Sequence, residues 1–193
     1  KPILHLPNDV IVTTPNDQIV FPDGATFSFN PNLSFIDADI PRLAFQTNEL
    51  DVAGVPARVS GTLANLHLTP RLASGKYHLT GAGALAQPPL SAQLHAALSG
   101  SFKRRGPTVT ITADSSSVLD VSDLDIAGTV QSAAPLALSP AKTVTLSIDQ
   151  SKPAPSLTYS AQLAPINAQL KGNLPPFSLA FPDIEVSGST AGH

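Results

Sequence analysis

Ile126-Ala127-Gly128-Thr129-Val130 is a stretch in which two aliphatic residues enclose a small residue, a glycine and a polar residue. In an extended strand the first, third and fifth residues share one face, so this stretch presents an apolar face with a notch at the glycine. The pattern recurs through the 193-residue chain, and we expect its copies to be equivalent Gly-notched strands. The other copies are Val59-Ser60-Gly61-Thr62-Leu63, Leu98-Ser99-Gly100-Ser101-Phe102 and Leu170-Lys171-Gly172-Asn173-Leu174.

Several other stretches alternate between polar and apolar side chains, which is the period-two pattern of a half-buried strand. Residues 108–112, 143–148 and 157–163 alternate in this way, and residues 25–36 do so with a break at Asn30-Pro31-Asn32. Four of the eight Phe residues lie between positions 21 and 35, so we expect the N-terminal part to seed a core. Residues 90–98 fit both a helix and a strand, and their alternation continues to Phe102, which favours a strand.

Proline and glycine punctuate the whole chain, with 19 and 12 residues respectively, and this distribution disfavours long helices. We therefore predict an all-β fold of roughly a dozen short, mainly antiparallel strands in a curved sheet, sandwich or β-groove, with little or no helix. The length suits a single domain over residues 1–193, with turn-rich strands in 1–40 and Gly-notched strands in 41–193. A chain of this size ordinarily buries about 70% of its unfolded surface.

The composition excludes several classes of partner and site. The net charge is −3 with only 13% charged residues, so we expect no nucleic-acid partner. No apolar run approaches about 18 residues, so we expect no transmembrane span. The absence of Cys excludes disulfides and thiol nucleophiles.

The chain has no Met, even at position 1, and its low charge and its many Ser, Thr and Ala residues are common in exported bacterial envelope proteins. We expect that a signal peptide has been removed and that the protein is periplasmic or extracellular, with a trimmed boundary as the alternative reason for the missing Met.

Catalytic motifs are missing from the sequence. There is no Gly-x-Ser-x-Gly, no phosphate-binding glycine loop, and no metal-ligand spacing among the five His residues. Carboxylates two residues apart could serve a glycosidase, but the chain has no Trp and only two Tyr to bind a sugar. We expect a protein that is not an enzyme, with no catalytic residue, no cofactor and no metal.

Four acidic residues gather at Asp114, Asp120, Asp123 and Asp125, and clustered carboxylates can bind Ca²⁺. Their spacing is not that of an EF-hand loop. Strand alternation places Asp123 and Asp125 on one face, so a solvated strand face explains them equally well. Both interpretations stay open at the level of the sequence.

Lys103-Arg104-Arg105 is the single basic run, and Gly106-Pro107 follows it directly. A solvated hairpin turn accounts for such a run. The functional alternative is contact with an anionic group of a lipid headgroup or of a partner protein.

The glycine notches also have two interpretations. Glycine in a strand marks a bulge or a bend of the sheet. Alternatively, aligned notches line an apolar groove in which an acyl chain or a partner backbone lies close to the sheet. The candidate ligand-binding residues of that groove are Val59, Gly61, Leu63, Leu98, Gly100, Phe102, Ile126, Gly128 and Val130.

The Gly-notched strands, the tract Ala134-Pro135-Leu136-Ala137-Leu138-Ser139-Pro140, the low charge and the lack of Cys resemble the repeating β segments of AsmA/TamB-type envelope proteins. The resemblance covers about residues 43–190, and the Pro-Asn-Asp repeats at 7–9 and 15–17 depart from it. It implies an elongated β-groove that handles lipid in the bacterial envelope.

We therefore expect an exported protein that binds or guides a lipid or another apolar ligand in a groove, with an envelope protein as a further partner. The alternative is a structural or adhesive β-sandwich protein that acts through protein–protein contacts.

Overall fold

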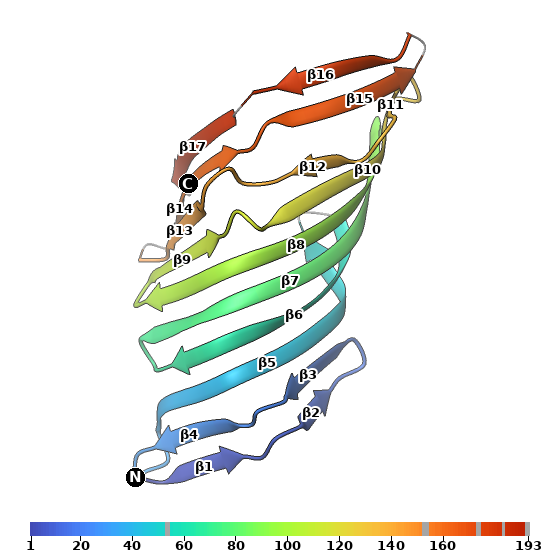
Figure 1. Ribbon diagram of the computed structural model, residues 1–193. Coiled ribbons are helices and arrows are strands. Elements are labelled where there is room, and N and C mark those ends of the chain that lie inside the picture. The colour runs from blue at the N-terminus through green and yellow to red at the C-terminus, as the bar shows by residue number, and fades with distance from the viewer. Residues whose placement is uncertain (53–54, 152–154, 173–174, 183, 192–193) are drawn as a thin grey trace.

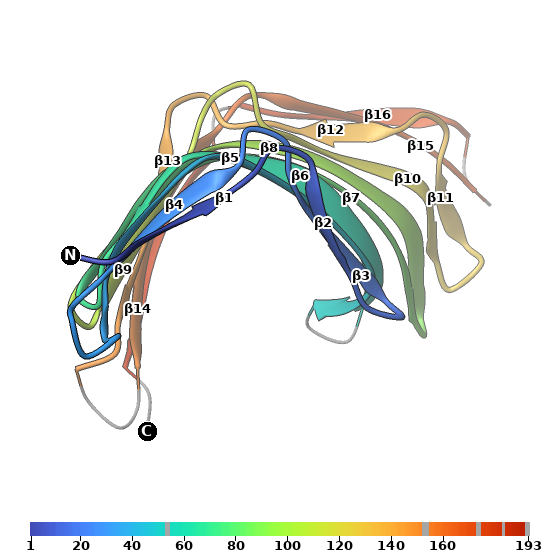
Figure 2. The ribbon, with the colours of Figure 1, turned by 90° about the horizontal axis from the view of Figure 1, so that it is seen from below.

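The computed structural model describes residues 1–52, 55–151, 155–172, 175–182 and 184–191. These residues form 17 strands and no helix, and every strand belongs to one antiparallel sheet. The sheet is a single layer bent into an open arch (Figures 1 and 2). The all-β prediction is thus confirmed in its curved-sheet form, and none of the described residues forms a second sheet packed on the first. Nor do they include any helix able to cross a membrane.

Four continuous strands run from one arm of the arch to the other and set its curvature (Figure 2). They are longer than the short strands expected from the sequence, because the glycines at 61, 81 and 100 lie inside strands and do not end them. The four strands are β5 (Phe35–Val52), β6 (Val55–Leu68), β7 (Leu72–Gln87) and β8 (Leu90–Arg105).

Shorter strands flank these four, and each flanking row is divided between the two arms. On the N-terminal side β4 and β3 pair with β5, β1 pairs with β4, and β2 pairs with β3. The bounds are β1 (Ile3–Leu6), β2 (Val10–Thr13), β3 (Asp17–Phe21) and β4 (Ala25–Phe29).

On the C-terminal side β9 and β10 pair with β8. On one arm β13, β14 and β17 then follow β9, and on the other arm β11, β15 and β16 follow β10, with β12 also paired to β10. The bounds are β9 (Thr108–Ala113), β10 (Val118–Ile126), β11 (Val130–Ser132), β12 (Leu136–Leu138), β13 (Val144–Asp149), β14 (Ser156–Leu163), β15 (Ile166–Gly172), β16 (Phe177–Phe181) and β17 (Ile184–Ala191).

Local turn chemistry divides the flanking rows. Asp9 of the first Pro-Asn-Asp repeat has a φ of 61° and ends the short link between β1 and β2. Gly24 lies beside this link with a φ of 68°, and a Cβ there would overlap the Leu6 carbonyl oxygen. Between β9 and β10, the buried Ser117 hydroxyl accepts the Ser99 N–H at 3.0 Å and donates to the Ser99 carbonyl at 3.1 Å. These contacts fix where β1 ends and β2 begins, and where β9 ends and β10 begins.

The buried cluster is small and lies where β4 meets the long strands β5 and β6. Ala25, Ile40 and Leu66 form its centre, with Phe21 and Phe27 packed against them. The prediction that the N-terminal part seeds a core is confirmed for these two phenylalanines, whereas Phe35 is exposed. The chain buries less of its surface than a compact protein of the same size. The accessible surface is 11894 Å², whereas a compact chain of 19.9 kDa has about 8,700 Å². The excess surface follows from the single layer, which leaves both faces of the sheet uncovered.

Candidate ligand-binding cleft on the concave face

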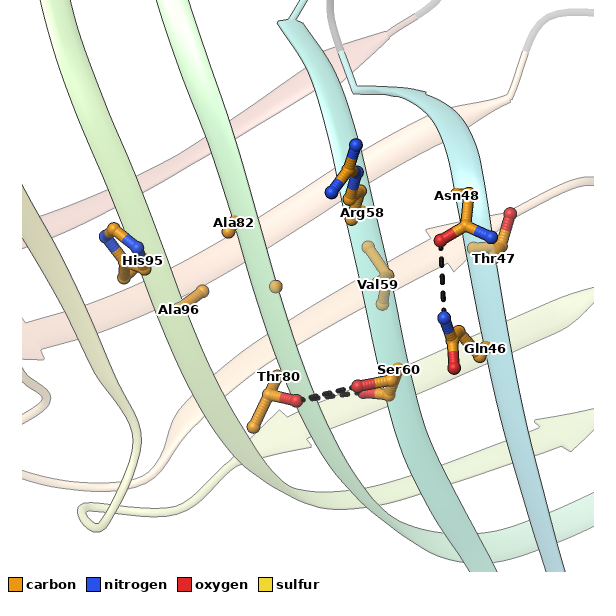
Figure 3. Close-up of a pocket in the computed structure, with 11 residues that line it drawn as sticks. Gln46, Thr47, Asn48, Arg58, Val59, Ser60, Thr80, Ala82, His95 and Ala96 are labelled. Atoms are coloured by element: carbon orange, nitrogen blue, oxygen red, sulfur yellow. Dashed lines mark hydrogen bonds between the residues drawn. The ribbon is translucent and has the colours of Figure 1, made fainter. Parts of the chain in front are cut away.

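Cross-strand register aligns apolar residues of the long strands on one face. Val59 lies opposite Gly81, and Gly81 lies opposite Ala96. The alternate positions of β6 and β8 carry Arg58 and His95, which lie on either side of Ala82 and line a different hollow together with Ser60 and Thr80 (Figure 3). The two faces of the sheet therefore differ in chemistry: the convex face is polar and the concave face is apolar.

The concave face holds an apolar cleft of about 320 Å³, near the lower end of the range of about 300–1,000 Å³ for ligand pockets. The end of β5 and the start of β6 curl back beneath the arch (Figure 2), and Leu50 and Val55 of these segments form one wall of the cleft. Glycine at 83 permits this packing, because a Cβ there would lie 3.1 Å from Val55 Cγ1. Apart from Thr80, every lining residue is apolar or glycine: Leu50, Val55, Ala57, Val59, Leu79, Thr80, Gly81, Ala82, Gly83, Leu94, Ala96, Leu98 and Leu119.

Two of the candidate groove residues line this cleft, namely Val59 and Leu98. Leu63 and Phe102 instead pack against the buried cluster around Ile40, where they act as core residues. The structure thus separates residues that share one strand face, since the cleft lies towards one arm and the core lies elsewhere along β6 and β8.

The glycine notches at 61 and 100 are filled by neighbouring side chains. A Cβ at Gly100 would lie 2.8 Å from Tyr77 Oη and would overlap the Thr112 carbonyl oxygen. Tyr77 crosses the notch and donates a hydrogen bond of 2.9 Å to that carbonyl. Burial raises the pKa of the Tyr77 phenol, and the Asp114 carboxylate acts in the same direction. At Gly61, Leu79 Cδ2 lies 2.8 Å from the position of a Cβ, so neither notch is open.

The expectation that residues 126–130 form one notched strand is wrong. Ile126 ends β10 and Val130 begins β11, and the two residues pair across a loop of three residues. The Thr129 N–H donates to the Ile126 carbonyl at 3.0 Å, which closes a turn at Ala127 and Gly128. Ala127 and Gly128 both have positive φ, 55° and 67°, as a type I′ turn requires. Nothing lies within 4 Å of a Cβ built on Gly128. This glycine serves the turn, and the three candidate residues of this stretch lie at a hairpin tip and not in the cleft.

The fourth copy of the pattern departs from the expectation in a different way. Gly172 ends β15 opposite Val130, and a Cβ there would overlap the Thr129 carbonyl oxygen. Asn173 and Leu174 lie outside the described residues. Close backbone approach to the neighbouring hairpin explains this glycine.

The basic run Lys103-Arg104-Arg105 forms the end of β8, next to the turn at Gly106 and Pro107. All three side chains are exposed, and Arg104 Nε donates to the Gly106 carbonyl at 3.2 Å. The hairpin interpretation is therefore confirmed for the backbone. The cleft meets β8 at Leu94, Ala96 and Leu98, and the run lies beyond these residues at the end of the strand. Contact with an anionic group stays a prediction.

The acidic residues do not share a face as strand alternation predicted. A bulge in β10 lies between Ser122 and Asp125, and Asp123 has a φ of 50°. Asp125 Oδ1 accepts the Gly128 N–H at 2.8 Å and so stabilises the hairpin turn. Over the described part of the chain, no three His, Asp or Glu side chains converge as a cation site requires.

The convex face has a hollow of about 470 Å³ with a polar lining (Figure 3). Two pairs of its polar groups bond to each other: Gln46 Nε2 donates to Asn48 Oδ1 at 3.3 Å, and the Ser60 and Thr80 hydroxyls lie 3.0 Å apart. Arg58 and His95 of the same lining are exposed to water, so a ligand there would compete with solvent for these groups. The concave cleft is the stronger candidate site.

Sequence reasoning missed most of the cleft lining. A signal was present for part of it, since Leu79-Thr80-Gly81 is a looser copy of the glycine pattern and Leu94 and Ala96 belong to the alternation of residues 90–98. No local signal marks Leu50 and Val55, because these two residues join the site only through the curvature of the sheet.

Comparison with known proteins adds no assignment: no family model, no curated protein and no solved structure matches this chain.

Proposed function

We propose that the concave face binds an apolar ligand that contains an alkyl chain, such as the acyl chain of a lipid, and that the protein acts by binding and not by catalysis. The observation that supports this proposal is the uncovered apolar face of a single-layer sheet. Domains ordinarily cover such a face with a second layer of secondary structure. Here an apolar cleft lies open on that face, so a bound alkyl chain would act as the missing layer.

The chemistry of the lining supports an alkyl chain over a polar ligand. Thr80 is the one lining residue with a polar side chain, and its hydroxyl lies 3.0 Å from that of Ser60 on the convex face. Burial of a methylene group contributes about 0.8 kcal/mol, so even a short acyl chain gains several kcal/mol there. The lining would leave the hydrogen-bonding groups of a sugar or nucleotide unpaired.

The basic run at the C-terminal end of β8 supports a lipid with an anionic headgroup. The ion pairs among the described residues join Lys1 to Asp37, Arg42 to Asp23 and His67 to Asp39, and none uses Lys103, Arg104 or Arg105. These exposed cations are available to a phosphate or carboxylate. A periplasmic or cell-surface location and an AsmA/TamB-like role in the envelope belong to this proposal.

The test fills the cleft without disturbing the sheet. A Cβ at Gly81 would meet its nearest atoms at 3.5 and 3.6 Å, which is ordinary contact, so Gly81→Leu should fold and occupy the cleft. Ala84→Leu is the matched control, since it adds the same side chain at an exposed position of the same strand. We expect a fluorescent fatty-acid analogue to bind the wild type and Ala84→Leu, and to bind Gly81→Leu at least tenfold more weakly. Equal affinity for all three proteins would overturn the cleft assignment.

The second candidate function is a structural or adhesive role through protein–protein contacts, and the unpaired edges of the sheet favour it. In that case the analogue binds none of the three proteins, and native mass spectrometry of protein extracted from cells shows oligomers without bound lipid.

A further inference from the structure

We propose that copies of this chain associate head to tail, with the β1/β2 edge of one copy adding to the β16/β17 edge of the next, so that the concave face continues from copy to copy. This inference rests on the edges of the sheet and is independent of the ligand proposed above.

Both edges of the sheet have one free side among the described residues. On the N-terminal edge β1 pairs only with β4, and β2 pairs only with β3. On the C-terminal edge β16 pairs only with β15, and β17 pairs only with β14. Each edge therefore presents a row of backbone N–H and C=O groups, which is a template for the addition of another strand.

The edges also carry most of the strongly exposed large apolar side chains. Seven of the eleven such side chains among the described residues lie on these four strands, although the strands hold only a small part of the chain. Natural edges are usually protected by charges or prolines, but β2 and β16 contain neither. The seven side chains are Ile3, Leu4, Ile11, Val12, Leu179, Phe181 and Val186.

The direction of the strands fits head-to-tail addition. Successive antiparallel pairings lead from β1 through β4, β5, β6, β7, β8, β9, β13 and β14 to β17. The other arm leads from β2 through β3, β5, β6, β7, β8, β10, β11 and β15 to β16. Each path has an odd number of pairings, so the two edges run in opposite directions on both arms. A copy placed in line thus continues the antiparallel sheet.

A head-to-tail contact also accounts for both edges at once. A symmetric dimer through one edge would leave the other edge of each copy open, whereas a heterologous contact pairs the two edges and can repeat. Association through edges of this kind is concentration-dependent, and its end product is a chain of copies.

The absence of Cys from the chain allows a clean cross-linking test. Val12→Cys places a thiol on β2 and Leu179→Cys places one on β16, both at exposed positions. With a short bis-maleimide, we expect a cross-linked dimer only when the two variants are mixed, and a ladder of oligomers from the double variant. Ala84→Cys on the central strand β7 is the control and should give no dimer. Dimers from either single variant alone, or from the control, would overturn the head-to-tail arrangement.

A second measurement tests the same contact without a cross-linker, whose length limits which thiols it can join. Val12→Lys and Leu179→Lys put a charge on one edge each, and each should lower the mass seen by sedimentation velocity from oligomer to the 19.9 kDa monomer. Ala84→Lys should leave the oligomers unchanged, and circular dichroism checks that all variants stay folded. A wild type that stays monomeric at every concentration would refute the inference.

Discussion

Tyr77 illustrates how single residues complete this sheet. Its ring lies over the position where Gly100 lacks a side chain, and Tyr159 does the same at Gly188, where a Cβ would lie 2.6 Å from its hydroxyl oxygen. A glycine relaxes the sheet and lets it bend, and an aromatic side chain on the neighbouring strand covers the exposed backbone. Glycine and tyrosine therefore act as a pair, which a pattern within one strand does not reveal.

Adding a methyl group should be costly at one glycine and harmless at another. Gly100→Ala would overlap the Thr112 carbonyl oxygen, and we expect it to lower the free energy of unfolding by about 1–3 kcal/mol. Gly81→Ala meets only ordinary contacts and should raise it by about 0.4–1 kcal/mol. Urea denaturation of both variants checks this, and equal effects would contradict the close packing described at Gly100.

Tyr77 also predicts a pH dependence. Its pKa is raised in the fold, so the protonated phenol is the form that the fold favours. Well below pH 10 the phenol is protonated in both the folded and the unfolded chain, and the stability that Tyr77 contributes is fully present there. As the pH rises past this value the unfolded chain ionises first, and stability falls.

The matched variant for this titration is Tyr77→Phe. At neutral pH this variant lacks the hydrogen bond to Thr112, and its free energy of unfolding should be about 0.5–1.5 kcal/mol lower than that of the wild type. Between neutral and alkaline pH, its free energy of unfolding should fall by less than that of the wild type. Thermal unfolding over that range measures both quantities, and parallel curves for the two proteins would refute the assignment.

At the scale of elements, the sequence predicts strands well and turns less well. The alternation of residues 108–112, 143–148 and 157–163 corresponds to β9, β13 and β14. The prediction for residues 126–130 was wrong because the same pattern of aliphatic, small and glycine residues fits both a strand and the β10–β11 hairpin. The difference lies in the positive φ at Ala127, and alanine gives no sign of that conformation.

The hairpin makes its own prediction. Ala127→Asn creates Asn-Gly, the preferred pair of a type I′ turn, and should stabilise the protein because asparagine tolerates a positive φ better than alanine. Gly128→Val should cost at least about 1–2 kcal/mol for the opposite reason. Thermal unfolding of each variant, with fatty-acid binding as a parallel readout, tests this. A loss of binding without a loss of stability in Gly128→Val would return this glycine to the candidate site.

At the scale of the molecule, composition and punctuation predict an all-β chain but not its single layer. The apolar face of β6, β7 and β8 could equally have packed on a second sheet. The open arch depends on strand pairs far apart in the sequence, such as β8 with β10 and β14 with β17. The cleft is equally hard to predict, since Leu50 and Val55 meet the residues of β7 and β8 only in the folded sheet.

Hydrogen exchange should map this architecture. The amides of β6 and β7 lie between two neighbouring strands along most of their length, so we expect the slowest exchange there. Amides of β1, β2, β16 and β17 should exchange fastest in dilute protein, because edge strands open locally at low cost. Uniform protection of edges and centre in dilute protein would contradict the open sheet.

The open underside of the arch has a consequence for the kinetics of a bound chain. A guest can enter and leave sideways along its whole length, without a portal and without a limit on how far it extends past the protein. No gate then sets the residence time, and only the number of methylene groups in contact does. At about 0.8 kcal/mol per methylene, each added carbon within the cleft should slow release about fourfold, which stopped-flow displacement of a series of acyl chains would measure.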